Sequence, residues 1–78
     1  MSVRVRLHAG VRERAGTAEL EVEGGTVAAV REAIAAACPA IADRLEFCRF
    51  AAGDEFVGEE TALSDGATVD LIPPVSGG

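Results

Sequence analysis

The chain has 78 residues, 49% of them hydrophobic, and a net charge of −6. This length corresponds to one domain, and the hydrophobic fraction suffices for a packed core and is too high for a disordered chain. The acidic balance argues against nucleic acid as the main partner. No apolar run approaches the roughly 18 residues of a membrane span, and no signal peptide is recognisable. We therefore expect a cytoplasmic protein with no membrane partner.

Alternating residues predict two strands at the beginning of the chain. Between them we expect a loop over residues 9–16. His8 falls on the exposed phase of the first strand, and the second strand has a polar face of glutamates that can pair with Arg4 and Arg6 across a hairpin. The apolar phases of the two strands are Val3, Val5 and Leu7, then Ala18, Leu20 and Val22.

A helix is predicted to follow the Gly24-Gly25 turn. Thr26 is a favourable N-cap, and Pro39 ends or kinks the helix at the residue before it. A further short helical turn is expected over residues 40–44. The apolar positions at helical spacing are Val27, Val30, Ile34, Cys38 and Ile41, which predicts one face packed on a sheet.

Three strands are predicted in the second half of the chain, at residues 47–51, 56–57 and 67–72. Turn residues separate them at 53–54 and 64–66. The order of elements indicates an α+β domain with one main helix covering one face of a mixed sheet. The core is expected to include Val5, Leu7, Leu20, Val30, Ile34, Val69 and Leu71.

Cys38 and Cys48 are the only cysteines, and the chain has one histidine. Their spacing fits no zinc site, so no metal is expected. Both cysteines lie in apolar stretches, which indicates buried free thiols in a reducing compartment.

The chain ends in Gly77-Gly78, behind Pro73-Pro74 and Val75-Ser76. The prolines stiffen the chain as it leaves the last strand. Glycine has no Cβ, so it can enter a channel too narrow for other residues. We interpret residues 1–72 as the folded domain and residues 73–78 as a flexible tail that is inserted into another protein.

The chain resembles the small subunit of molybdopterin synthase, a sulfur-carrier family with the ubiquitin-like β-grasp fold. The resemblance covers nearly the whole chain, and its most specific part is the ending from Ile72 to Gly78. His8 stands where an aromatic residue is usual. The other matching residues are Val11-Arg12-Glu13, Ala15-Gly16, Thr26-Val27, Leu63 and Asp65-Gly66.

This resemblance implies a role for the terminal carboxyl group. An ATP-dependent activating enzyme would adenylate Gly78, which would then become a thiocarboxylate. The large subunit would take in the tail, and sulfur would pass to cyclic pyranopterin monophosphate. The family assembles as a heterotetramer in which the large subunit supplies the active site, so the chain would bind no cofactor directly. The tail that enters the partner would be Pro73, Pro74, Val75, Ser76 and Gly77.

Other functions are compatible with the same ending. The chain could carry sulfur for the thiazole of thiamine or for thiolation of tRNA. It could also be a ubiquitin-like modifier joined through Gly78 to lysines of target proteins, or an interaction module whose tail has no function. A stand-alone enzyme is not expected, because no nucleophile–base pair or metal cluster is recognisable.

Overall fold

Five strands form one mixed sheet in the order β2-β1-β5-β3-β4. The structure is a computed structural model that describes residues 1–74. Within this range no helix has the length and apolar character needed to cross a membrane. The elements in chain order are β1 (Ser2–Leu7), α1 (Ala9–Ala15), β2 (Glu19–Glu23), α2 (Val27–Ala37), the 3-10 helix η1 (Pro39–Phe47), β3 (Arg49–Ala52), β4 (Glu55–Val57) and β5 (Thr68–Ile72).

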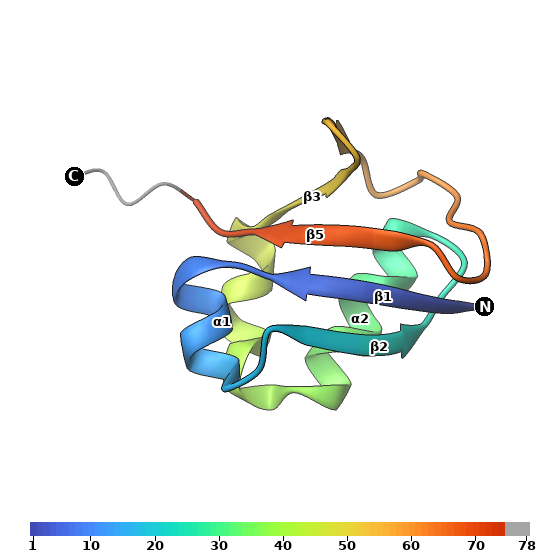
Figure 1. The fold of residues 1–78 in the computed structure, drawn as a ribbon. Helices are drawn as coiled ribbons and strands as arrows, with labels where there is room; N and C mark the ends of the chain where they lie inside the picture. The colour runs from blue at the N-terminus through green and yellow to red at the C-terminus, as the bar shows by residue number, and fades with distance from the viewer. Residues whose placement is uncertain (75–78) are drawn as a thin grey trace.

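Helix α2 covers one face of the sheet (Figure 1). The strands turn alternate side chains toward it, as the period of two requires. Most of the predicted core is confirmed, and the fully enclosed side chains come from the sheet, from α2 and from η1. They include Val3, Val5, Leu7, Val27, Val30, Ile34, Ile41, Phe50, Val69 and Leu71. This mixed sheet with one main covering helix is the predicted ubiquitin-like β-grasp architecture.

The two central strands, β1 and β5, are parallel. Val5 is opposite Val69, and Leu7 is opposite Leu71. The chain therefore leaves β5 at the end of the sheet opposite to Met1, beside the beginning of α1 (Figure 1). This arrangement separates the amino terminus from the segment that leads to the Gly-Gly end.

Helix α2 begins where the sequence predicted. The Thr26 hydroxyl accepts a hydrogen bond from the Ala29 N–H at 3.2 Å. Two further N–H groups of the first turn, those of Val27 and Ala28, donate to the carbonyls of Thr61 and Glu59. Because the first turn of a helix has no internal acceptors for its N–H groups, these contacts satisfy it. They also fix the long connection between β4 and β5 against the helix.

Gly24 is required by the packing between β2 and α2. A Cβ atom at this position would lie 2.9 Å from Val30 Cγ2 and 3.0 Å from Val30 N. Such a contact would push the helix away from the sheet, so the turn needs glycine here for close approach.

Residues 9–16, predicted to be a loop, instead contain helix α1. Val11 is 4% exposed and packs in the core, and Gly16 ends the helix with a φ of 77°. A helix of seven residues has little stability of its own. Its packing against η1, supported by the Arg14 Nε hydrogen bond to the Ala40 carbonyl at 2.8 Å, explains why local propensity failed to predict it.

Phe47 was also predicted wrongly, as the first residue of a strand. It ends η1, which is longer than the predicted turn at residues 40–44, and its side chain is 61% exposed.

Leu20 is only partly buried, because it lies on the edge strand β2, and Ala18 precedes that strand and is exposed. Cys38, at the end of α2, is likewise only partly buried.

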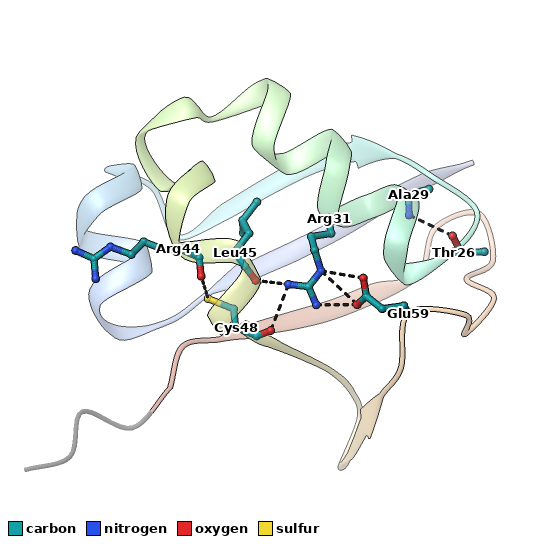
Figure 2. A network of polar contacts seen from close by, with 7 residues as sticks. All are labelled: Thr26, Ala29, Arg31, Arg44, Leu45, Cys48 and Glu59. Carbon is teal, nitrogen blue, oxygen red and sulfur yellow. Dashed lines mark hydrogen bonds and ion pairs between the residues drawn. The ribbon is translucent and has the colours of Figure 1, made fainter.

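Arg31 connects α2 to two other parts of the chain (Figure 2). Its guanidinium donates to both Glu59 carboxylate oxygens, with the shortest distance 2.7 Å from Nη2. It also donates to the backbone carbonyls of Leu45 and Cys48. The same group lies 5.0 Å from the centre of the Phe50 ring.

Replacing Ile34 with alanine should lower the free energy of unfolding by about 2–5 kcal/mol, because it opens a cavity between α2 and the sheet. In so small a domain this is a large part of the total stability. The measurement is equilibrium unfolding in urea. Leu20→Ala is the matched control and should cost less, since Leu20 is half-buried at the sheet edge. A cost for Ile34→Ala well below about 1 kcal/mol would contradict the packing described here.

Candidate functional site

The candidate site is the end of the molecule from which the tail leaves β5. A groove with a volume of about 680 Å³ lies here, and we call it the tail-root groove. One wall comes from the beginning of α1 and the residue before it: His8, Ala9, Gly10, Val11 and Arg14. The other walls are Arg44, Phe47 and Cys48 from η1 and its end, and Ile72, Pro73 and Pro74 from the root of the tail.

Two of the three phenylalanines are exposed, and one of them lies at this end of the fold. Phe47 lines the tail-root groove and is 61% exposed, whereas Phe50 is in the core. Phe56, 53% exposed, lies on β4 with the Arg49 guanidinium 3.8 Å from its ring centre. Exposed aromatic rings are unusual in a chain with so few of them, and aromatic side chains are enriched in protein interfaces.

Asp70 holds a polar cluster on the open face of the sheet. Arg6 Nε donates to Asp70 Oδ1 at 2.9 Å, and His8 Nε2 lies 2.8 Å from the same oxygen. The Asp70 side chain is only 13% exposed. Hydrogen bonds from Arg6 and then from His8 hold the pKa of the Asp70 carboxyl below its usual range, against the opposing effect of burial. Thus His8, predicted to be exposed, is half-buried and tied to β5.

Cys48 is a buried residue that lines the tail-root groove. Its thiol donates a hydrogen bond to the Arg44 carbonyl at 3.2 Å. Burial raises the pKa of the Cys48 thiol, and the nearby Arg31 and Arg44 oppose this effect only in part. Since a thiolate is the reactive form of cysteine, this environment favours an inert thiol.

The structure places two of the predicted tail residues. Pro73 and Pro74 follow directly on β5 and line the tail-root groove. Val75, Ser76, Gly77 and Gly78 lie outside the described residues. The sequence analysis did not predict the groove itself, because its walls come from segments that are distant in the chain.

Comparison with known proteins agrees with this fold. A curated relative from Chlamydomonas reinhardtii, a molybdopterin synthase sulfur carrier subunit, is 39% identical over the full length of both chains. The solution structure of small archaeal modifier protein 1 from Methanosarcina acetivorans has a TM-score of 0.87, with 28% identity over 99% of this chain and 96% of that one.

A third comparison concerns a protein solved with its partner. A chain of the complex between subunits 1 and 2 of the molybdopterin-converting factor from Helicobacter pylori 26695 has a TM-score of 0.72. It is 25% identical, with full coverage of both chains. The fold and these matches define a ubiquitin-like carrier protein. The chain belongs to the ThiS family, a family of sulfur carriers whose model matches residues 5–78.

Replacing Asp70 with asparagine should reduce stability at neutral pH and have progressively less effect in acid. The reason is that the folded pKa of Asp70 lies below its unfolded value of about 3.9. The ionised carboxylate therefore stabilises the fold above that value, and this contribution is lost as the pH falls through the folded pKa. The measurement is urea unfolding of both proteins from about pH 7 to about pH 2.5. Glu21→Gln, on the edge strand, is the control. A difference between wild type and Asp70→Asn that stays constant into acid would contradict this assignment.

Proposed function

We propose that this chain carries sulfur for molybdopterin biosynthesis through its terminal Gly78. An ATP-dependent activating enzyme converts the Gly78 carboxylate to an acyl adenylate and releases pyrophosphate. A donor that supplies sulfur at the oxidation level of sulfide then forms a C–S bond at the acyl carbon, displaces AMP and leaves a thiocarboxylate. Adenylation is needed because a carboxylate oxygen is a poor leaving group. The observation that carries this proposal is the ending Pro73 to Gly78 in a chain that matches a molybdopterin synthase sulfur carrier subunit over its full length.

The acceptor in this scheme is cyclic pyranopterin monophosphate, bound by the large subunit of molybdopterin synthase. Each dithiolene has two sulfur atoms, so two charged carriers are consumed per product. The chain itself acts as a substrate-like, non-catalytic subunit of a heterotetramer. The complex of subunits 1 and 2 from Helicobacter pylori supports a large-subunit partner.

The position of the tail root fits this role. Pro73 and Pro74 continue straight from β5, at the end of the sheet opposite to Met1. The folded body can therefore rest against the outside of a partner while the tail enters it. From Pro73 to Gly78 an extended chain spans about 20 Å, which is enough to reach an enclosed active site.

A protein modifier is the second candidate, because the relative from Methanosarcina acetivorans is named a modifier protein. Both functions would begin with adenylation of Gly78. They differ in the nucleophile, which is sulfur for a carrier and a target lysine amine for a modifier. Intact mass of the protein from its own cells distinguishes them: a carrier gains a thiocarboxylate, and a modifier is found in isopeptide conjugates. Transfer of sulfur to thiamine thiazole or to tRNA would give the same thiocarboxylate with a different acceptor.

Blocking the tail should abolish sulfur transfer without unfolding the protein. Gly77→Val adds a branched side chain that restricts the backbone and widens the tail, and a C-terminal tag removes the free carboxylate of Gly78. Both changes lie beyond β5 and leave the core intact. The measurements are the thermal melt, thiocarboxylate formation by intact mass, and sulfuration of the pterin by the large subunit. The same tag at Met1, at the far end of the sheet, is the control and should be tolerated (Figure 1). Full activity of an uncleaved C-terminally tagged protein would overturn the carrier proposal.

Neither cysteine should be needed for sulfur loading. The Cys48 thiol is buried and its pKa is raised, so it is a poor nucleophile. A Cys38→Ser, Cys48→Ala double variant should lose some stability and still gain one sulfur at its C-terminus. The measurement is intact mass after incubation with the activating enzyme, ATP and the sulfur donor, on protein shown to be folded by its thermal melt. Failure of a folded double variant to gain sulfur would contradict this prediction.

A further inference from the structure

The tail-root groove combines an apolar surface with a basic rim. Phe47 is 61% exposed, and Ile72, Pro73 and Pro74 continue the apolar surface along the root of the tail. An aromatic ring left this exposed contributes little to folding, because little of its surface is removed from water. Exposed rings in concave sites are typical of the residues that dominate the energy of protein interfaces.

The charged side chains that line the groove are arginines, and one of them, Arg14, lies 3.7 Å from the Asp43 carboxylate outside the lining. Arg14 and Arg44 line the groove, and none of the lining residues within the described part of the chain is acidic. The chain as a whole carries 13 acidic residues and a net charge of −6, so a groove without them is a local exception. It favours an occupant with negative charge.

The two arginines of the groove differ in how their side chains are held. Arg14 Nε donates to the Ala40 carbonyl at 2.8 Å, and Arg14 Nη2 lies 3.7 Å from Asp43 Oδ2, with the side chain still 45% exposed. The carbonyl of Arg44 accepts the Cys48 thiol, and its side chain extends away from the Arg31 network, toward α1 (Figure 2). The occupant therefore meets one guanidinium group, that of Arg14, already held by the fold, which reduces the entropy lost on binding.

We propose that the tail-root groove is a docking site for the protein that receives the tail. A segment of that protein places an apolar side chain against Phe47 and Pro73, and carboxylates beside it pair with Arg14 and Arg44. This inference rests on the proposed function, in which the receiving protein is the large subunit of molybdopterin synthase. A partner that takes in the tail lies over Pro73 and Pro74, so it reaches the groove without any change in the fold.

The test is the affinity of the purified large subunit from the same organism for folded variants of the full chain. Phe47→Ser removes the apolar anchor, and Phe47→Leu keeps an apolar side chain. Arg44→Ala changes the net charge by one unit at the rim, and Ala36→Glu makes the same change on the exposed end of α2, outside the groove. Binding is measured by calorimetry at low and at physiological salt, and folding is checked by thermal melt.

We expect Phe47→Ser to weaken binding at least about tenfold, and Phe47→Leu to stay within about twofold of wild type. Arg44→Ala should weaken binding most at low salt, whereas Ala36→Glu should have little effect. If Phe47→Ser and Arg44→Ala bind like wild type while tail truncation weakens binding, this inference is overturned and the proposed function stands. Equal effects of Arg44→Ala and Ala36→Glu would also overturn it, since net charge alone would then explain the loss. If the wild-type chain does not bind the large subunit, the proposed function fails together with the inference.

Discussion

The guanidinium of Arg31 connects three parts of the fold that are distant in the sequence. It lies on α2, donates to the Leu45 and Cys48 carbonyls at the end of η1, and pairs with Glu59 in the connection from β4 to β5 (Figure 2). The last carbonyls of a helix have no internal donors, so a long cationic side chain is well suited to satisfy them. With 22% of its side chain exposed, Arg31 is partly removed from water, and its hydrogen bonds compensate for that loss of hydration.

The consequence of this contact extends to the candidate site. Arg31 fixes the backbone on both sides of Phe47, since Leu45 precedes it and Cys48 follows it. The Phe47 ring is then presented at the surface rather than turned into the core, which Phe50 fills. In the same way, the parallel pairing of β1 with β5 brings Pro73 beside α1. The groove therefore exists because two long-range constraints meet at one end of the sheet.

The sequence predicted the structure well wherever apolar residues recur at a regular spacing and one face of the element is buried. The alternation in β1 and β5 and the helical spacing from Val27 to Ile34 predicted those elements and most of the core. Thr26 marked the start of α2, and Pro39 marked its end. In these segments local propensity, spacing and tertiary packing all favour the same structure.

Prediction failed where packing between distant segments decides the conformation. Helix α1 is short and contains Gly10, and it is explained by the burial of Val11 in the core together with its packing against η1. Phe47 was assigned to the strand predicted at residues 47–51, whereas it ends η1, between the two backbone carbonyls that Arg31 contacts. The apolar phase of β2 was correct at Val22 and overestimated at Leu20, because periodicity does not reveal which strand lies at the edge of a sheet.

A Gly-Gly end that is common to many carriers raises the question of how each carrier binds its own partner. In the proposed function the Gly-Gly terminus would provide reactivity and passage, but a terminus shared among carriers would distinguish poorly between receiving proteins. Discrimination must then come from differences in affinity at the folded body. In this chain the residues that can provide such discrimination near the tail are those of the groove and of the open sheet face. This surface is chemically mixed, because Phe47 is apolar, Arg44 is basic and the Asp70 cluster is polar. Under the proposed function, a carrier with this surface would use a terminal chemistry common to such carriers and still be specific for one acceptor.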